Sequence, residues 1–305
     1  MTYVLCEQTI LNLARAYSFL RTEILAETSQ GRAIRTLVIG NGPRKVIYSA
    51  AWHANEWITT PVLLKFVEDF AQALTGGGEI FGINAGDLAA KVTIYTVPMV
   101  NPDGVDLVTG AIGPDEPAYQ NAAQIAAGFP AIPFPDGWKA NLNGVDLNLQ
   151  FPAGWLRARE IKFLQGYNRP APRDYVGRAP LHQREARAMA GYTEYIDPDL
   201  VLAYHSQGKE IYWSFLDYEV PGAQALGEEL ARVSGYRLAE PAPNSSYAGY
   251  KDWFIKIFRR PGYTVEVGSG ENPLPLSQFE EIYRDNLGIL VTAALGGELP
   301  LTVRA

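Results

Sequence analysis

The sequence predicts a single α/β domain in which helices cover both faces of a central β-sheet. Three stretches, residues 91–100, 201–205 and 263–268, are apolar runs of strand length, which is typical of strands buried on both faces. Segments with helical spacing alternate with these runs, as they do in α/β folds. The chain has 305 residues, 47% of them hydrophobic, which is enough for one large core. Neither an interdomain linker nor an internal repeat divides it.

The N-terminal third predicts a helix, two strands and a second helix. Apolar residues recur at helical spacing in residues 7–26, which predicts an amphipathic helix. Two β-branched runs, 33–40 and 45–52, flank the turn sequence NGP and predict a hairpin. Residues 60–74 predict a helix, because Pro61 stands near its first position and a run of glycines follows its end.

The later part of the chain predicts three more helices, at 182–196, 222–234 and 276–294. Residues 101–180 differ from these segments, because they are rich in proline, glycine and aromatic residues and show little periodicity. Long segments of this kind are usually functional loops that lie over the end of a sheet. We therefore expect this region to contribute to the functional site.

The composition argues against several classes of function. A net charge of −7 does not suit a nucleic-acid-binding protein, which needs a basic face to neutralise phosphates. The N-terminus lacks the features of a signal peptide, and no stretch approaches about 20 uncharged apolar residues, so we expect no membrane span. Cys6 is the only cysteine, so it cannot form an internal disulfide, and it is expected to pack in the first helix.

Two candidate metal ligands, His53 and Glu56, stand three positions apart just after an expected strand. A catalytic zinc site uses three protein ligands and keeps a fourth position open for water. Only His182 and His205 remain as histidines for the third ligand. His205 ends an apolar strand, where open α/β sheets assemble their sites. His182 stands among charged residues at a helix start, where an exposed or capping role is the simpler interpretation. We expect His205 to be the third ligand.

Glu266 is an acidic residue inside the apolar run 263–268. Burying an unpaired carboxylate is costly, so Glu266 needs a salt bridge, a place at the strand end or a functional role. Beside a metal ion it would be suited to take a proton from water. We interpret Glu266 as the candidate general base of a metal-dependent hydrolase.

Five short motifs follow one another along the chain: HANEW (53–57), PMVNPDGV (98–105), GVDLN (144–148), AYHSQG (203–208) and TVEVG (264–268). In these motifs and in their order, residues 7–295 resemble the zinc carboxypeptidase-like peptidases of the M14 type. The resemblance implies a mixed, roughly eight-stranded twisted sheet flanked by helices on both faces, with the metal site at the sheet edge. It also implies one Zn²⁺ per chain.

The resemblance assigns a role to each candidate residue of the metal site. It implies that His53, Glu56 and His205 hold the zinc ion. Asp146, in GVDLN, matches the family carboxylate that accepts the second ring N–H of the first histidine ligand, a contact that fixes the tautomer.

Two further residues would carry out the chemistry. Glu266 would be general base and then general acid. Lys139 stands where the family usually has an arginine that stabilises the oxyanion, and lysine keeps the charge but loses the forked geometry.

The departures from the family pattern point to the substrate. In ordinary carboxypeptidases an arginine follows GVDLN and binds the terminal carboxylate of the substrate with the help of the asparagine. Here Asn148 is kept, but Leu149 takes the arginine's place, and Asn55 replaces another usual arginine. The sequence is more similar to the γ-D-glutamyl-L-diamino acid peptidases, which cut the stem peptides of peptidoglycan. HANEWITTP (53–61), GVDLNLQFPAGW (144–155) and NRPAPRDYVGRAPL (168–181) carry this likeness.

Such a substrate, with meso-diaminopimelate as the common diamino acid, has carboxylates on both sides of the scissile bond and so needs cations in the site. Residues 155–178 are locally basic, and we expect Arg173 to bind a carboxylate. Lys251 stands where the family forms the floor of the pocket for the leaving side, and we expect it to suit the distal carboxylate of diaminopimelate. Tyr247 is the candidate for the family's mobile tyrosine.

Two alternatives stay open at this point. The first is a general metallocarboxypeptidase that removes C-terminal residues, which Leu149 disfavours. The second is a non-catalytic module that binds muropeptides, which would have no need of Glu266. The expected partner is a stem peptide or muropeptide, with no nucleic acid and no membrane. We expect one catalytic domain over 1–305 without a wall-binding repeat, located in the cytoplasm and open to release to the wall during sporulation or lysis.

Overall fold

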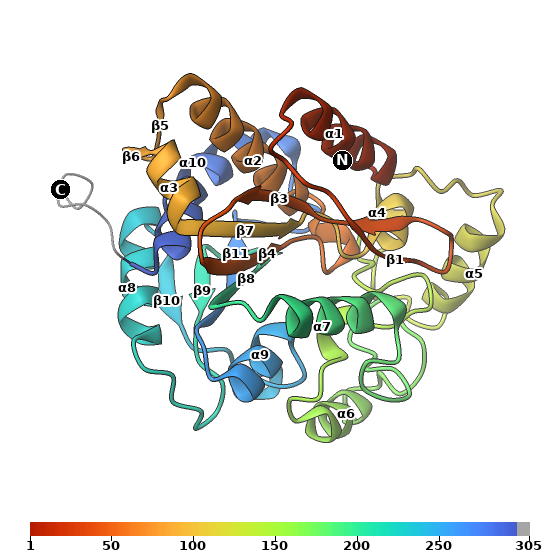
Figure 1. The fold of residues 1–305 in the computed structure, drawn as a ribbon. Helices are drawn as coiled ribbons and strands as arrows, with labels where there is room; N and C mark the ends of the chain where they lie inside the picture. The colour runs from red at the N-terminus through yellow and green to blue at the C-terminus, as the bar shows by residue number, and fades with distance from the viewer. Residues whose placement is uncertain (298–305) are drawn as a thin grey trace.

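The computed structural model describes residues 1–297, and in this part of the chain a mixed seven-stranded sheet forms the centre of the fold (Figure 1). Its strand order is β10-β9-β11-β8-β4-β7-β3. The strands are β3 (Leu37–Gly40), β4 (Arg44–Ser49), β7 (Val92–Val97), β8 (Leu200–Ser206), β9 (Glu210–Tyr212), β10 (Arg237–Ala239) and β11 (Gly262–Val267). Two small sheets lie outside it, one of β1 (Ile24–Glu27) with β2 (Ala33–Arg35), the other of β5 (Glu79–Ile80) with β6 (Ile83–Asn84).

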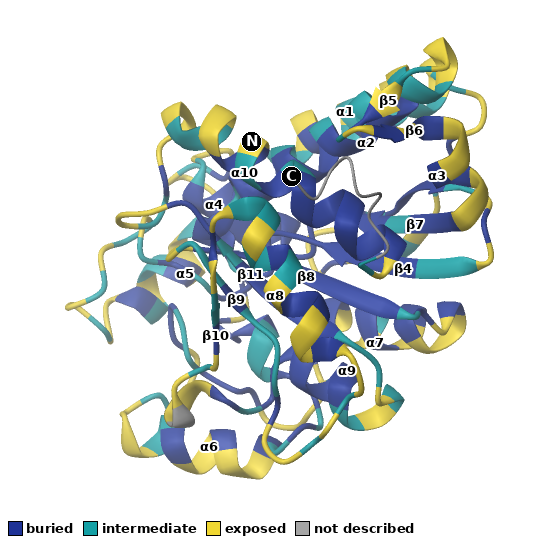
Figure 2. Cartoon of the chain, turned by 90° about the vertical axis from the view of Figure 1, so that its left-hand side faces the viewer, coloured by how far each residue is buried: buried dark blue, intermediate teal, exposed yellow. Residues whose placement is uncertain are grey.

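Helices pack on both faces of the central sheet, as the sequence predicts. One face is covered by α1 (Tyr3–Ala16), α2 (Thr59–Gly76), α3 (Ala85–Lys91), α8 (Ala223–Ser234) and α10 (Phe279–Leu295), and the other by α7 (Arg184–Ile196) and α9 (Tyr250–Phe258). Figure 2 shows the sheet and the inward faces of these helices as buried, with exposed residues on the outward faces of α6 (Trp155–Leu164) and α8. The core therefore has two layers separated by the sheet.

Strand alternation decides which residues enter each core layer. In β8, Leu202 and Tyr204 point into the layer beneath α2 and α10, whereas Val201 and Ala203 point into the layer beneath α7 and α9. β4, β8 and β11 run parallel, so their carboxyl ends lie at one edge of the sheet. Because the central strands are buried on both faces, the polar residues at this edge stand out against an apolar background.

The region 101–180 crosses this edge of the sheet and contains three short helices, α4 (Pro102–Val108), α5 (Pro117–Ala126) and α6. Asn101 anchors its start: its side-chain oxygen caps α4 by accepting from Gly104 N–H, and its amide donates to the carbonyl of Ala140 at 3.1 Å. These contacts explain the Asn-Pro-Asp-Gly stretch as a structural element that holds the loop at the sheet edge.

The predicted hairpin at 33–40 and 45–52 is wrong. β7 lies between β3 and β4, antiparallel to β3 and parallel to β4. The first run also divides, because β2 pairs with β1 in a separate sheet. A parallel neighbour on each side makes β4 a central strand, and helices cover both of its faces, which suits its apolar run better than an edge position would.

Other expectations differ from the structure in extent. The first helix spans Tyr3–Ala16 and not 7–26, because the chain extends from Tyr17 and forms β1. The described sheet has seven strands where roughly eight were expected. Cys6 is buried in the first core layer, as predicted. Among residues 1–297, no helix combines the length and the hydropathy that a transmembrane span needs.

Candidate metal centre and substrate cavities

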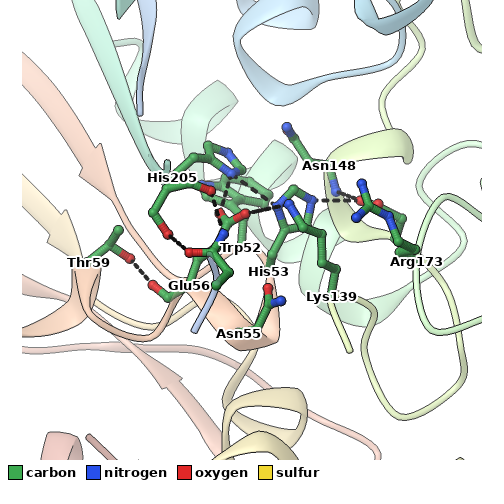
Figure 3. Close-up of polar contacts among 12 residues, drawn as sticks. Trp52, His53, Asn55, Glu56, Thr59, Lys139, Asn148, Arg173 and His205 are labelled. Carbon is green, nitrogen blue, oxygen red and sulfur yellow. Dashed lines mark hydrogen bonds and ion pairs between the residues drawn. The ribbon is translucent and has the colours of Figure 1, made fainter. Parts of the chain in front are cut away.

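Two chain segments at the carboxyl edge of the sheet bring the three candidate metal ligands together. His53 and Glu56 lie in the turn after β4, where Ala54–Glu56 form a short 3-10 helix, and His205 lies near the carboxyl end of β8. Ligand atoms of the three side chains lie within 4.8 Å of one another. Figure 3 shows the side chains pointing toward one another.

The donor atoms of these side chains fit a zinc ion. Nδ1 of His53 lies 3.2 Å from Nδ1 of His205 and 3.0 Å from Oε1 of Glu56, and Nδ1 of His205 lies 2.9 Å from Oε2 of Glu56. Two imidazole nitrogens and a carboxylate are a ligand set of catalytic zinc. Once His53 has lost its Nδ1 proton, a cation between them would be held by lone pairs of all three side chains. Glu56 and His205 are each only 1% exposed, so bulk solvent has little access to these two side chains.

Asp146 holds the first histidine in place. The Nε2 of His53 donates to Oδ1 of Asp146 at 3.0 Å, which leaves Nδ1 to face the other two ligands. The carboxylate is itself fixed by the backbone N–H groups of Asn148 at 3.1 Å and Asp174 at 3.2 Å. Burial would raise the pKa of Asp146, but the neighbouring His53 holds it well below its usual range.

The charges of the site depend on one another. Burial alone would lower the pKa of His53, but the carboxylates of Glu56 and Asp146 raise it to about 9. Burial would likewise raise the pKa of Glu56, whereas His53 and Lys139 hold it well below its usual range. In the metal-free chain His53 is therefore protonated near neutral pH, and a metal ion must displace that proton.

Glu266 lies beside the cluster, on the strand next to His205. β11 pairs with β8 in parallel register, and Glu266 stands directly opposite His205. Burial and the negative charge of Glu56 raise the pKa of Glu266 to about 8. Lys139, from the 101–180 region, donates from Nζ to Oε1 of Glu56 at 2.8 Å. One carboxylate and one cation are thus placed at the rim of the cluster.

Two cavities meet at this rim. The first, here the Arg173 cavity, has a volume of about 510 Å³ and is lined by Asn55, Ile132, Lys139, Arg173, Gln207, Tyr212, Glu266, Glu271 and neighbouring residues. The second, here the Lys251 recess, has a volume of about 290 Å³ and is lined by His53, Lys139, Asn148, Leu149, Tyr212, Tyr247, Lys251, Asp252, Thr264, Glu266 and neighbouring residues. Both include Lys139, Tyr212 and Glu266, so a substrate could pass from one to the other across the cluster.

The four expected substrate-binding residues all line one of these cavities. Arg173 lines the first cavity, with its Nε donating to Asp174 at 2.6 Å. Asn148 lines the recess, and its Oδ1 accepts from the backbone N–H of Tyr250. Tyr247 packs over Gly154, where a β-carbon would approach the tyrosine ring to 2.7 Å. Lys251 is buried at the recess wall.

The other basic residues of 155–178 have structural partners or point to solvent. They are Arg157, paired with Glu160; Arg159, over Trp155 and Phe163; Lys162, paired with Asp174; Arg169, over Phe129; and the exposed Arg178. His182 is exposed, contacts Gln183 and lies outside the cluster of His53, Glu56 and His205. Of the six basic residues, only Arg173 lines either of the two cavities.

Sequence reasoning missed two residues of the recess, Asp252 and Tyr212. Asp252 could have been noticed as an acid three positions after Gly249, the pattern of a helix N-terminus that also places a carboxylate next to Lys251. Tyr212 carries no such signal, because its place depends on the antiparallel pairing of β9 with β11.

Sequence comparisons agree with this geometry. The model of the zinc carboxypeptidase family M14 matches residues 6–288. The chain is 47% identical over 289 residues to gamma-D-glutamyl-L-diamino acid endopeptidase 1 of Lysinibacillus sphaericus. This match covers 95% of the chain and 71% of that protein. It is 37% identical over 289 residues to the uncharacterized protein YqgT of Bacillus subtilis (strain 168), covering 93% of this chain and 74% of that protein.

Solved structures share the fold. Thrombin activatable fibrinolysis inhibitor superposes with a TM-score of 0.78 at 15% identity, over 98% of this chain and 75% of that chain. Murein-tripeptide amidase MpaA from Escherichia coli O157 gives a TM-score of 0.54 at 19% identity, over 92% and 93% of the two chains. Together with the family match, this likeness confirms the mixed α/β fold. The chain therefore belongs to the zinc carboxypeptidase family M14 and is a metallopeptidase.

Proposed function

We propose that the protein is a zinc-dependent peptidase that hydrolyses the γ-D-glutamyl–diamino acid bond of peptidoglycan stem peptides. The observation that carries this proposal is the 47% identity, over nearly the whole chain, to a protein named as an endopeptidase for that bond. The substrate would be a stem peptide or a muropeptide, and one catalytic domain would bind it.

His53, Glu56 and His205 would hold one zinc ion per chain, and Asp146 would orient His53. When bound there, zinc supplies a Lewis acid that lowers the pKa of a water molecule and polarises the scissile carbonyl. The support for this role is the convergence of the three donor groups, whose ligand atoms lie within 4.8 Å of one another.

The remaining steps belong to side chains at the rim. Glu266 would take a proton from the attacking water as the water oxygen bonds to the carbonyl carbon of the γ-amide of D-glutamate. Lys139, within 2.8 Å of Glu56 and at the junction of both cavities, would stabilise the negative charge that develops on the carbonyl oxygen. Glu266 would then give the proton to the leaving amine as the C–N bond breaks. The place of Glu266 on β11, directly opposite His205, supports this role.

The cavity walls explain why a C-terminal residue is a poor substrate under this proposal. Leu149 presents an apolar side chain to the recess beside Asn148, so the usual cation for a terminal α-carboxylate is missing at this position. Arg173 instead lies in the other cavity, where it would suit the α-carboxylate of D-glutamate on the acyl side of the bond. Tyr247 lines the recess and would close over the bound peptide.

Mass spectrometry of defined stem peptides tests the proposal. Tri- and tetrapeptides that contain either diaminopimelate or lysine would be incubated with the zinc-loaded enzyme, with and without a chelator, and with the Glu266→Gln variant as the matched inactive form. We expect cleavage between D-glutamate and the diamino acid that the chelator and the variant both abolish. Release of the C-terminal residue alone would support a general carboxypeptidase. Binding of zinc and peptide without any cleavage would support a non-catalytic module.

A further inference from the structure

The Lys251 recess contains a buried pair of opposite charges. Lys251 is 5% exposed and Asp252 is 4% exposed, and the Nζ of Lys251 lies 2.6 Å from Oδ1 of Asp252. The Nζ also donates to the carbonyl oxygen of Ser214 at 2.5 Å. Both residues line the recess together with Glu266. A buried ion pair is costly to desolvate and seldom adds stability over apolar packing, so its presence in a cavity wall calls for a functional reason.

The carboxylate of Asp252 is only partly used by the fold. Its Oδ2 accepts from the backbone N–H of Gly249 at 3.2 Å and so caps α9. Its Oδ1 is buried and makes no hydrogen bond of good geometry within residues 1–297, although it lies close to the Lys251 ammonium. A buried carboxylate oxygen with spare acceptor capacity is unusual in a folded protein. It is suited to receive a donor from a ligand.

Lys251 has the complementary capacity. An ammonium group has three donors, of which one is donated to the carbonyl of Ser214, while the carboxylate of Asp252 contacts the ammonium as an ion pair at 2.6 Å. The pair therefore offers one donor of positive charge and one acceptor of negative charge, side by side, and is neutral as a whole. A group with a carboxylate and an ammonium on the same carbon matches this pattern, whereas a single charge of either sign meets a like charge as well as an opposite one.

The charges of the two cavities decide which end of the substrate enters the recess. Lys139 lines both cavities, whereas Arg173 lines only the first, where its guanidinium suits a lone carboxylate such as that of D-glutamate, whose amine is acylated in the stem peptide. The recess offers the Lys251–Asp252 pair. Of the two sides of the scissile bond, only the diamino acid side of diaminopimelate ends in a carbon that carries both charges. Leu149 adds an apolar surface for the methylene chain that leads to it.

We infer that Lys251 and Asp252 form a receptor for the zwitterionic distal end of the diamino acid, with Lys251 bound to its carboxylate and Asp252 to its ammonium group. The inference rests on the proposed function and extends it, because it assigns specificity for diaminopimelate over lysine to one pair of side chains. Lysine is the same chain without the distal carboxylate, and 2-aminopimelate is the same chain without the distal ammonium group. Each of these lacks the partner of one member of the pair.

A matched substrate series tests the inference on the wild-type enzyme. Three peptides of the form L-alanyl-γ-D-glutamyl-X, with X as meso-diaminopimelate, L-lysine or L-2-aminopimelate, differ only at the distal carbon. We expect kcat/KM for diaminopimelate to exceed that of each analogue by at least about tenfold, because each analogue leaves one buried charge without its partner. Equal rates for the three peptides would overturn the inference while leaving the proposed function intact. Failure to cleave any of them would instead count against the proposed function.

Two variants then assign each charge to its residue. Lys251→Met should bring the preference for diaminopimelate over lysine to within about threefold, because the distal carboxylate loses its partner. Asp252→Asn keeps an oxygen to cap Gly249 and should reduce the preference over 2-aminopimelate in the same way. Lys65→Met and Glu68→Gln change a charged pair on α2, outside both cavities, and should alter neither ratio.

Zinc content and thermal unfolding show whether each variant is folded. If a variant does not fold, the substrate series on the wild-type enzyme still tests the inference. A crossed pattern, in which each variant loses one ratio and keeps the other, supports the assignment. Loss of activity on all three peptides by the same factor in a folded, zinc-loaded variant would contradict it, because a merely structural pair would affect every substrate alike.

Discussion

Asp146→Asn removes a charge behind the metal site and leaves the shape of the side chain almost unchanged. In the structure, the carboxylate receives three hydrogen bonds: Oδ1 accepts from His53 and from the backbone N–H of Asn148, and Oδ2 accepts from the backbone N–H of Asp174. An amide has only one acceptor atom. If the amide oxygen faces His53 and Asn148, its NH₂ group faces the N–H of Asp174, donor against donor.

The opposite orientation of the amide is worse for the metal. Its NH₂ group would then face Nε2 of His53, which could accept only in the tautomer that carries its proton on Nδ1, the atom needed by the metal. In either orientation the support of the ligand is weakened. Loss of such a contact lowers metal affinity by about 10- to 100-fold, which corresponds to about 1.4 to 2.7 kcal/mol.

Competition with a chromogenic chelator at fixed pH measures this change in zinc affinity. Asp87→Asn is the matched control, since Asp87 is exposed on α3 and contacts neither cavity. A zinc affinity within about threefold of wild type, with the fold of the Asp146 variant intact, would refute the reasoning that His53 is a ligand oriented by Asp146.

Three other perturbations have expected outcomes. Glu266→Gln should keep zinc but lower kcat by at least about 10³-fold, because it removes both proton transfers, and steady-state rates at equal zinc content check this. Zinc binding should release protons and become tighter as pH rises toward 9. In the metal-free chain the pKa of His53 is raised to about 9 and that of Glu266 to about 8, and a bound cation lowers both pKa values. Calorimetry in buffers of different ionisation enthalpy measures the proton release, and a zinc affinity that does not depend on pH would contradict the prediction. Leu149→Arg should add measurable trimming of C-terminal residues, because it places a guanidinium in the recess beside Asn148, and release of the terminal residue from an ordinary dipeptide assays it.

The central strands could be predicted from the sequence because their signal is local. The apolar runs that form β7, β8 and β11 need no knowledge of their neighbours, and burial on both faces leaves little choice of residue. The pairing between strands was not predictable in the same way. The sequence NGP between two β-branched runs favours a hairpin, yet β7 lies between β3 and β4, a pairing between distant segments that no local pattern indicates.

The candidate metal site could be proposed from the sequence for a similar reason. His53, His205 and Glu266 each stand out chemically at the end of an apolar strand, and the order of motifs resembles that of a known family. The substrate cavities were harder to predict from the sequence, because their walls combine segments that only the fold brings together. Lys251 was expected to meet a carboxylate of the substrate, but its contact with Asp252 and with the carbonyl of Ser214 depends on how α9 begins and where β9 ends.

Hydrolysis of the tetrapeptide L-alanyl-γ-D-glutamyl-meso-diaminopimelyl-D-alanine in H₂¹⁸O tests the central claim most directly. Water attack at the γ-carbonyl should place one ¹⁸O atom in the D-glutamate of the alanyl-glutamate product and none in the released diaminopimelyl-alanine, as read by mass spectrometry. Free D-alanine with the label in the new carboxyl group of diaminopimelate would contradict the account and identify a carboxypeptidase.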